Sequence, residues 1–530
     1  MTAAAEHLLP TFECATCDHI FLRPETAQKP VSARVKELLK SNVPPLHEER
    51  LELAGIAAQS SRAVADLEQR IVQAQQMLDA LVRERDIAAE HLKNAKTLLH
   101  PIRTLSDDIL REIFVHCGKE WDDFYLAHPL HDSIKTTLPP WTISQVSRQW
   151  RCVAISTSRL WSSISLDFPS YTANHAVSLS FKLGLCLQRA PKCDLALRIH
   201  STTDLSGHPI FPMLLMSMSR WKRLRIDVPC ETLHSLSAYA GFLVSLTTLI
   251  IKDTPGATEH LSPISTFHLA SSLKTLDVDP RVLVHLHLTW KQLTHLSSWG
   301  AHSRRSLEIL KKVQGVDASI KHLSFKFSNS KIPPFPLNES DPPVLLPNVV
   351  YIAAGETASA STSIARLFMN INTPNLDQIF LDYDHSGPVE FPAIPLDNRI
   401  TYLTLYCNLA AQTRTTKRLI DFISAGQSLD TLVLHARGIG KALISKLARE
   451  SNRKNILPCL TILDLRQSTY DGVAHSLIVN MIASRRKRQK EDESLLWQLH
   501  LDSPLVLDDP QVAAQWKNLC EEGLDVEYGS

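Results

Sequence analysis

The residues with the clearest potential for metal chemistry lie near the start of the chain. Cys14 and Cys17 have the Cys-x-x-Cys spacing, and His19 follows closely. Two thiolates at this spacing form half of a tetrahedral zinc site. No second Cys-x-x-Cys and no histidine pair follows within reach, so four ligands are not available locally. The pattern therefore favours an inert turn, with metal binding as the alternative.

Motifs for phosphate binding and catalysis are incomplete. Gly438, Gly440 and Lys441 are similar to a phosphate-binding loop, but Ala442 replaces the Ser or Thr that such a loop needs. No Gly-x-Ser-x-Gly nucleophile motif and no His-Glu-x-x-His zinc helix occurs. The basic run 484–490 would suit nuclear import or nucleic-acid contact, yet acidic residues 491–493 follow at once and favour a solvated loop. We expect a non-catalytic protein without cofactor or metal.

The composition is that of a soluble globular protein with more than one structural unit. The chain has 530 residues, of which 44% are hydrophobic and 21% charged, and its net charge is +1. That length exceeds one typical core. A net charge near zero gives no global attraction to nucleic acid or to an anionic membrane. Without a signal peptide or a long apolar run, we expect reduced cysteines and a cytoplasmic or nuclear location.

A long helix with a heptad pattern is predicted over residues 46–100, after a segment at 1–45 that we expect to be poorly ordered. The stretch contains no proline and one glycine, Gly55. Apolar positions alternate in steps of three and four over five heptads, which is typical of coiled coils, and Arg85 is the one charged residue in the series. The seam predicts a homodimer or, almost equally, packing within the chain. The series is Val64, Leu67, Ile71, Ala74, Leu78, Leu81, Arg85, Ala88, Leu92, Ala95 and Leu99.

Short apolar strands recur through residues 190–510, before a C-terminal tail at 511–530. Their form is Leu-x-x-Leu-x-Leu, with Ile, Val or Phe at some positions, and the clear copies include residues 429–434 and 460–465. Repeats at such intervals indicate stacked strand–turn–helix units, each too small to bury its apolar face alone. We predict an α/β solenoid of irregular leucine-rich repeats with a parallel sheet on its concave side. The middle positions are Leu224, Leu249, Leu276, Leu296, Leu323, Ile352, Ile379, Leu403, Leu432, Leu463 and Leu499, and an earlier copy centres on Leu197.

The outward side of these strands is the predicted target-binding surface. Successive side chains of a strand point to opposite faces, so the residue between the last two apolar positions points away from the core. Mixed charges and aromatic rings there would suit a protein surface, although for any single residue an ordinary solvated face is the better interpretation. The substrate-binding candidates are Arg225, Asp277, Phe380, Tyr406, Asp464 and Arg466.

Three motifs lie between the heptad helix and the repeats. They are Pro-Ile-Arg-Thr-Leu-Ser-Asp-Asp-Ile-Leu-Arg-Glu-Ile-Phe at 101–114, Val-Ser-Arg-Gln-Trp-Arg at 146–151 and Leu-Trp-Ser-Ser-Ile at 160–164. Their order resembles an F-box, here at 101–168 with an insertion at 118–140. A heptad helix, such a box and irregular leucine-rich repeats are together similar to F-box proteins of the fungal type. Ser106 stands where that family usually has proline.

The resemblance implies a role in protein ubiquitylation. F-box helices bind a small Skp-type adaptor, which links them to a cullin–RING ubiquitin ligase (an SCF complex). The receptor performs no bond chemistry and holds a target protein near the conjugating enzyme. The resemblance implies adaptor contacts at Ile102, Leu105, Ile109, Leu110, Phe114 and Trp150. A stripe at helical spacing is usually core, which is the competing interpretation of about half of these residues.

One other function remains open from the sequence. Ser106 removes an apolar contact that the family's proline makes with the adaptor. If the adaptor does not bind for this reason, the chain would be a coiled-coil and leucine-rich-repeat scaffold for protein interactions that recruits no ligase.

Overall fold

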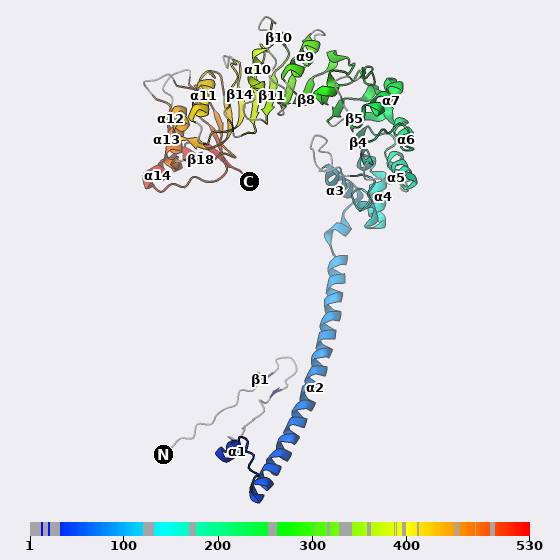
Figure 1. The fold of residues 1–530 in the computed structure, drawn as a ribbon, viewed down its shortest axis with the longest axis vertical. Coiled ribbons are helices and arrows are strands. Elements are labelled where there is room, and N and C mark those ends of the chain that lie inside the picture. The colour runs from blue at the N-terminus through cyan, green and yellow to red at the C-terminus, as the bar shows by residue number, and fades with distance from the viewer. Residues whose placement is uncertain are drawn as a thin grey trace. The chain divides into compact units, whose positions relative to one another are not determined.

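The computed structural model describes residues 12–13, 20–21, 32–119, 132–168, 176–252, 262–301, 303–314, 319–327, 342–357, 362–385, 387, 389–394, 399–410, 413–450, 455–471, 473–487 and 493–529. The chain divides into two compact units, Met1–Leu105 and Ser106–Ser530. Each unit has its own architecture (Figure 1). Cys14, Cys17 and much of segment 1–45 lie outside the described residues.

The first unit is dominated by α2 (His47–Leu98), a helix of 52 residues. Glu48 and Glu49 lie in its first turn, where carboxylates interact favourably with the helix dipole. The carboxylate of Glu49 also accepts a hydrogen bond of 2.8 Å from the backbone N–H of Leu46. Pro101 cannot continue the helix, and a short 3₁₀ helix, η1 (Pro101–Thr104), follows. The same unit contains the antiparallel pair β1 (Phe12–Glu13) and β2 (Ile20–Phe21), and α1 (Ala33–Leu38).

The long helix predicted over 46–100 is therefore confirmed as a helix. No residue of α2 is buried. Exposed apolar side chains include seam positions such as Ile71, Leu78 and Leu81, and neighbours such as Met77 and Val82. Its apolar surface is thus left in contact with solvent, which is unusual for a helix of this length.

The second unit begins with a small helical region. It comprises α3 (Asp107–Lys119), η2 (Ile143–Gln145), α4 (Arg148–Ser156) and η3 (Ser158–Trp161). The hydroxyl of Ser106 accepts a 3.5 Å hydrogen bond from the backbone N–H of Ile109 and so caps the start of α3. Gln149 donates to Asp107 at 2.9 Å and joins α4 to α3.

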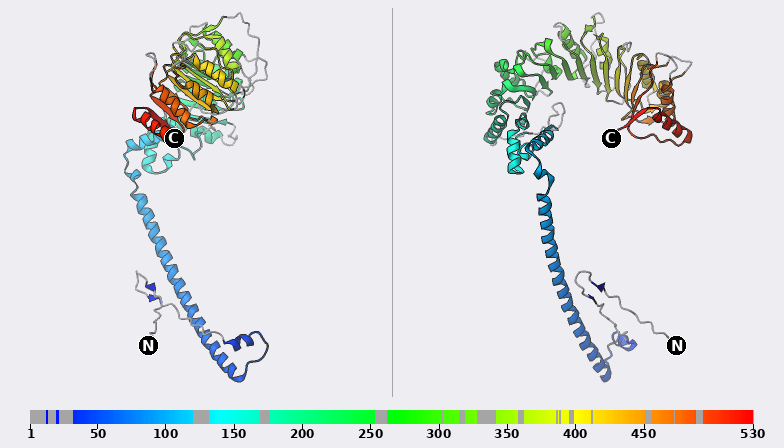
Figure 2. Two further views of the ribbon diagram at one scale, coloured as in Figure 1. Left: turned by 90° about the vertical axis from the view of Figure 1, so that its left-hand side faces the viewer. Right: turned by 180° about the vertical axis from the view of Figure 1, so that it is seen from behind.

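An open parallel sheet of fourteen strands follows within the described residues, and it does not close on itself. Helices α9 (Ser303–Gln314), α10 (Ser363–Met369) and α11 (Thr413–Ser424) lie along its outer side. The two views in Figure 2 show the same order of layers. The strands are β3 (Ser163–Asp167), β4 (Leu195–His200), β5 (Trp221–Asp227), β6 (Thr248–Ile251), β7 (Thr275–Val278), β8 (His295–Ala301), β9 (His322–Phe327), β11 (Tyr351–Glu356), β13 (Gln378–Tyr383), β14 (Tyr402–Asn408), β15 (Thr431–Arg437), β17 (Ile462–Asp464), β19 (Gln498–Leu501) and β20 (Asp525–Tyr528).

Each strand pairs with the strands that come before and after it in this series, so the sheet grows in chain order. The remaining helices are α5 (Ala176–Arg189), α6 (Phe211–Leu215), η6 (Met218–Arg220), α7 (Cys230–Ser235), η7 (Leu236–Ser245), α8 (Pro280–Leu283), η8 (Trp290–Gln292), α12 (Lys441–Leu447), α13 (His475–Arg485) and α14 (Pro510–Glu521). Two small parallel pairs stand outside the large sheet: β10 (Val344–Leu345) with β12 (Ile371–Asn372), and β16 (Ile439–Gly440) with β18 (Tyr470–Asp471).

One apolar row crosses all fourteen strands. Each middle residue predicted from the repeats pairs in register with the middle residue of the next strand. These side chains lie in the hydrophobic core between sheet and helices. The row also includes Ile164 at its start and Val526 at its end. The prediction of an α/β fold with a parallel sheet is thus confirmed.

The boundaries of the sheet differ from the predicted range 190–510. Strand β3 lies inside the segment assigned to the box at 101–168, and β20 lies inside the segment 511–530 assigned to a tail. Both strands are single copies of the apolar pattern at the ends of the series. Strand β3 carries the full pattern, with Trp161, Ile164 and Leu166 all buried, but it overlaps the third box motif.

Candidate functional site

Two of the predicted adaptor contacts are buried inside the second unit. Leu110 and Phe114 on α3 are 0% and 1% exposed. The ring of Phe114 lies 4.8 Å from that of Trp150 on α4, which is half-buried. The prediction that Leu110 and Phe114 face an adaptor is therefore corrected: they hold α3 against α4, because the stripe at helical spacing forms the interior of this helical region.

Other aliphatic side chains of the same region face outward. Ile109 is 50% exposed and Val146 is 61% exposed, and Ile113 on α3 and Ile155 on α4 also face solvent. Of these four residues, Ile109 was among the predicted adaptor contacts, whereas Ile113, Val146 and Ile155 were not. Contiguous exposed apolar patches mark protein contacts, whereas single exposed aliphatic groups are ordinary on a protein surface. We call Ile109, Ile113, Val146 and Ile155 the box surface.

Two further adaptor candidates belong to the first unit. Ile102 lies in η1 and Leu105 follows it, and both are half-buried. They belong to a different compact unit from α3 and α4, so they are not part of the box surface.

The insertion between the first two box motifs contributes to the core. Its residues 120–131 lie outside the described part of the chain, but Ile134 in its second half is buried. Trp141, which follows the insertion, packs edge-to-face on Trp161 at 5.0 Å. The indole of Trp161 donates to the carbonyl of Ala154 at 2.8 Å, and the guanidinium of Arg189 lies 4.2 Å from its ring centre. Trp161 thus joins the box helices to α5 and to the first strand.

The candidates for target binding all lie on the open face of the sheet, opposite the helices, but three of them are buried. Arg225 is ion-paired with Asp227 at 3.0 Å, Asp277 with Lys252, and Asp464 with Arg466 at 2.6 Å. Each of these three charges is therefore paired with an opposite charge of the same chain, and none is offered to a partner. The other three candidates, Phe380, Tyr406 and Arg466, are partly exposed.

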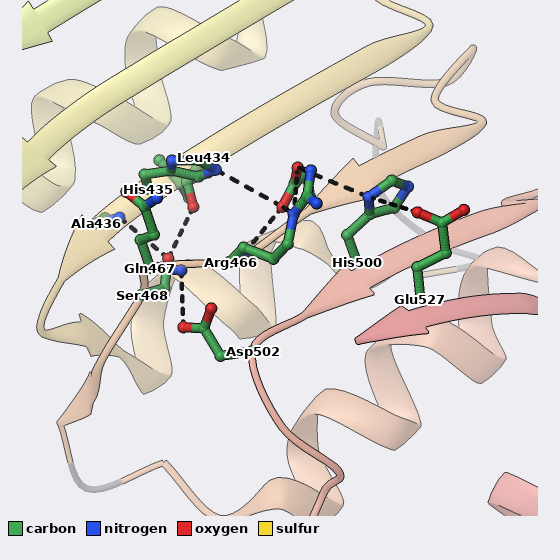
Figure 3. A network of polar contacts seen from close by, with 10 residues as sticks. Leu434, His435, Ala436, Arg466, Gln467, Ser468, His500, Asp502 and Glu527 are labelled. Carbon is green, nitrogen blue, oxygen red and sulfur yellow. Dashed lines mark hydrogen bonds and ion pairs between the residues drawn. The ribbon is translucent and has the colours of Figure 1, made fainter. Parts of the chain in front are cut away.

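The structure brings the last strands of the sheet together in one polar cluster, which Figure 3 shows. Asp464 at the end of β17 receives two parallel hydrogen bonds from Arg466, with Nε at 3.1 Å and Nη2 at 2.6 Å. Such a forked pair fixes the guanidinium plane as well as neutralising the charge. Burial alone would raise the pKa of Asp464, but the hydrogen bonds from Arg466 outweigh burial and lower it below its usual value.

A histidine flanks Asp464 on each side. His435 on β15 places Nε2 at 3.7 Å from one carboxylate oxygen, and His500 on β19 places Nδ1 at 3.8 Å from the other. His500 also lies 3.4 Å from a carboxylate oxygen of Glu527 on β20. Burial lowers the pKa of His435 despite its acidic neighbour, so its imidazole is neutral at pH 7. The two imidazole rings thus lie on either side of the Asp464–Arg466 pair. With Glu527, the cluster spans the adjacent strands β15, β17, β19 and β20.

The loop after β17 is held in a fixed conformation beside this cluster. The hydroxyl of Ser468 donates to the carbonyl of Leu434 at 2.8 Å and accepts from the backbone N–H of Ala436 at 3.0 Å. The backbone N–H of Gln467, whose φ is 56°, donates to Asp502 at 2.7 Å. Figure 3 shows these bonds beside Arg466. They position the exposed part of that side chain.

Aromatic rings extend the cluster toward the middle of the sheet. Tyr406 on β14 meets His435 edge-on at 4.5 Å, and Phe380 on β13 lies 5.4 Å from Tyr406. Burial, followed by the nearby charges of Asp464 and Asp382, raises the pKa of Tyr406, so its phenol stays protonated. The surface from Phe380 to Glu527 therefore combines two neutral aromatic side chains, an oriented guanidinium and an exposed carboxylate. We call this surface the open-face cluster.

A second aromatic position on the open face lies nearer the middle of the sheet. Trp299 on β8 is 48% exposed, with the ammonium groups of Lys252 and Lys326 at 4.3 and 5.6 Å from its ring centre. An exposed tryptophan between two cations is a strong candidate for a protein contact. Neither Trp299 nor His435 was among the predicted contacts. Side chains alternate between the two faces of a strand, so the third residue after each middle leucine also points to the open face. Counting three residues on from Leu296 and from Leu432 would have identified Trp299 and His435.

The arrangement around Asp464 disfavours a bound metal ion. Both carboxylate oxygens of Asp464 accept from Arg466, whose positive charge would repel a metal ion at the same place. In the described residues no group of three His, Cys, Asp or Glu residues is placed to hold a metal. No helix in that part of the chain has the length and apolarity that a membrane span requires.

The basic run 484–490 has a structural role that the sequence did not indicate. Arg485 is fully buried, and Arg486 donates to the carbonyls of Leu496 and Glu522. Of the described residues in this run only Lys487 is exposed. The interpretation of the whole run as a solvated loop is therefore wrong for its first half, because these arginines satisfy carbonyl groups inside the protein.

Comparison with known proteins adds no relative to this description. No protein-family model matches the chain, and a search of curated proteins found no significant match.

Proposed function

We propose that this chain is the non-catalytic substrate receptor of an SCF-type ubiquitin ligase, with an F-box that binds a Skp-type adaptor. The observation that carries the proposal is the order of its parts. Three motifs that resemble an F-box occupy α3, α4 and η3, and a long repeating sheet follows directly. A receptor of this kind needs one surface for the ligase and a separate surface for the target.

The large sheet supports the second half of the proposal. One apolar residue per strand packs in register, and each strand contacts only its neighbours in sequence order. A quasi-one-dimensional stack of this kind is what irregular leucine-rich repeats form, and such solenoids bind proteins on an extended open face. We propose that targets bind there, with the exposed rings and the oriented guanidinium of the open-face cluster as contacts.

The adaptor contacts are proposed at the box surface. Ile109, Ile113, Val146 and Ile155 expose aliphatic groups on helices whose interior is held by Leu110 and Phe114. Replacing buried Leu110 or Phe114 would unfold the region and would say nothing about binding. Replacing exposed residues separates the two effects.

Adaptor capture by the purified full-length chain tests the proposal. The wild type is expected to retain a Skp-type adaptor, and the double variant Ile109→Asp, Ile113→Asp is expected to lose it. The matched control is Val177→Asp, Met216→Asp, which places two aspartates on exposed apolar positions of α5 and of the residue after α6. Circular dichroism should show equal folding of both variants.

The result that would reject the ligase function is equally direct. If the wild type captures no adaptor, or if the Ile109→Asp, Ile113→Asp variant captures it as well as the control does, the box surface has no such role. The chain would then be better described as an interaction scaffold with the same target-binding face.

Target binding is tested separately. Proteins retained from a cell extract by the wild type are compared with those retained by the variant Phe380→Ala, Tyr406→Ala. Genuine targets should be lost from this variant but kept by Ile109→Asp, Ile113→Asp, and should accumulate in cells that lack the receptor. Equal retention by all three proteins would reject the open-face cluster as the binding surface.

A further inference from the structure

The apolar surface of α2 requires a partner. Over Val64–Leu99 the helix exposes a large aliphatic side chain on nearly every turn, and none of its residues is buried. Near the centre of the series Met77, Leu78, Leu81 and Val82 form the widest apolar stretch. An extended seam of this kind is covered by another helix in a stable assembly. The residue types along the seam indicate which helix covers it and in which orientation.

A parallel pair of α2 helices would bring identical residues together. In a parallel coiled coil each core layer contains the same position from both chains. Arg85 would face Arg85 of the second copy, with two like charges in an apolar interior. Ala74, Ala88 and Ala95 would each face their own equivalents, leaving three layers underpacked.

An antiparallel pair removes both defects in a single register. When Leu78 lies opposite Leu81 of the second copy, Ala74 lies opposite Arg85, Ala88 opposite Ile71 and Ala95 opposite Val64. Every alanine then meets a larger side chain, and the two arginines are separated along the axis. Arg85 also remains able to keep its ion pair with Asp86 at 2.6 Å, because Asp86 lies beside the seam.

We infer that α2 binds α2 of a second copy of this chain as an antiparallel coiled coil, with its two-fold axis between Leu78 and Leu81. The layers, from the centre outward, are Leu78–Leu81, Ala74–Arg85, Ile71–Ala88, Leu67–Leu92 and Val64–Ala95. The inference rests on the seam of α2 and is independent of any ubiquitin-ligase function.

This geometry separates the two receptor units. Leu98 lies about 18 residues from the two-fold axis, and an α-helix rises 1.5 Å per residue, so the two Leu98 residues stand roughly 55 Å apart. A parallel pair would instead place them side by side. Two target-binding faces would thus be carried at opposite ends of one rod.

Mass and crosslinking test the pairing in the full-length chain. Light scattering is expected to give twice the 59.4 kDa of one chain, and Leu78→Asp is expected to reduce this to a single chain. The matched control Gln76→Asp lies on the opposite side of the helix and should leave the mass unchanged. A wild type that remains monomeric at tens of micromolar would overturn the inference.

Orientation is tested with single cysteines carried on differently tagged, co-expressed chains. Leu67→Cys and Leu92→Cys are expected to crosslink to each other through a short thiol-specific reagent, and neither should crosslink to itself. Linked peptides are identified by mass spectrometry, which separates them from those of the native cysteines. Self-crosslinking of Leu92→Cys alone would establish a parallel pair and overturn the antiparallel register.

Discussion

Arg485 holds a charge inside the protein by satisfying three carbonyl groups at once. Its guanidinium donates to the carbonyls of Leu447 at 2.5 Å, Leu457 at 3.0 Å and Ile456 at 3.0 Å. Burial lowers its pKa to about 9, with nearby Arg449 acting in the same direction, but the group stays protonated at pH 7. The carbonyl of Leu447 lies at the end of α12, so the cation also meets the negative end of a helix dipole.

Replacing Arg485 by methionine should destabilise the second unit by about 3 kcal/mol, because buried carbonyls lose their donors. The neighbouring change Lys487→Met serves as control, since that side chain is exposed and should shift stability by less than about 0.5 kcal/mol. Urea unfolding followed by tryptophan fluorescence measures both variants. All tryptophans lie beyond residue 105, so the signal reports the second unit alone. Equal midpoints would show that the network contributes nothing.

His435 gives the second unit a pH dependence whose sign follows from its lowered pKa. The unfolded chain takes up a proton near pH 6.5, while the folded chain resists until a lower pH. The unfolded state therefore binds more protons in this window, and stability falls as the pH drops below about 6.5. The carboxylate of Asp464, whose pKa is also lowered, loses its contribution only in more acidic solution.

The stability of the variant His435→Gln should decline less than that of the wild type as the pH drops. Urea midpoints measured between pH 7.5 and pH 5.5 should fall less steeply for His435→Gln than for the wild type. His287→Gln is the control because that side chain is exposed, and its slope should equal that of the wild type. Burial also lowers the pKa of His208, His295, His322 and His385, so some decline should remain. Identical slopes in all three proteins would contradict the assignment.

The elements of the sheet divide their two faces between the hydrophobic core and the open face. Strand β14 turns Leu403 and Leu405 into the core, where both are fully buried, and turns Tyr402, Thr404 and Tyr406 to the open face. The strand has neighbours on both sides, β13 and β15. A change on its buried face is therefore felt across several strands, while a change on its open face alters surface only.

Leu403→Ala should destabilise the second unit by about 3 kcal/mol through lost burial and a residual cavity. Tyr402→Ala, one residue earlier on the open face, should cost less than about 1 kcal/mol, because that side chain is already partly exposed. Urea unfolding by tryptophan fluorescence compares the two. Similar losses from both changes would mean that the open face is itself covered in the folded protein.

At the scale of the whole molecule the two units bury apolar surface in different ways. The second unit has an extensive internal core that spans its sheet and helices. The first unit is mainly one helix without a buried residue. Most helical stability in proteins comes from packing of an apolar face against other elements. We therefore expect contacts outside the helix to contribute to the protection of the α2 amides against hydrogen exchange.

Hydrogen exchange at two protein concentrations distinguishes the sources of that protection. In dilute solution the amides of α2 should exchange far faster than those of β14, and their protection should rise with concentration as the helices associate. The amides of β14 provide the internal control, because their protection should not depend on concentration. Strong protection of α2 that is independent of concentration would favour packing within one chain over self-association.

The sequence predicted the repeating parts of the fold because periodicity is a local property. A spacing of three and four over 46–100 predicted α2, and the recurrent pattern around residues such as Leu249 and Leu432 predicted buried strands that pair in register. The edge strands β3 and β20 fell outside the predicted range, because β3 overlaps the third box motif and β20 lies in the segment assigned to a tail.

The candidate sites were only partly predictable, for a different physical reason. An apolar stripe on α3 identified residues that matter, but periodicity does not state which side of a helix meets its neighbours. The structure placed Leu110 and Phe114 inside and left Ile109 and Ile113 outside. In the same way, outward alternation placed Arg225 and Asp464 on the open face, while pairing with Asp227 and Arg466 buried both.

By itself the sequence determined that this chain has a long heptad helix, a box-like set of short helices and an open face formed by alternate residues of many strands. Only the tertiary structure decided which of those residues are available. Neighbouring strands lie about 4.8 Å apart, so residues such as His435, Asp464 and His500, roughly 30 residues apart in sequence, become neighbours on the open face. Contacts of that kind depend on register between distant segments, which no local pattern contains.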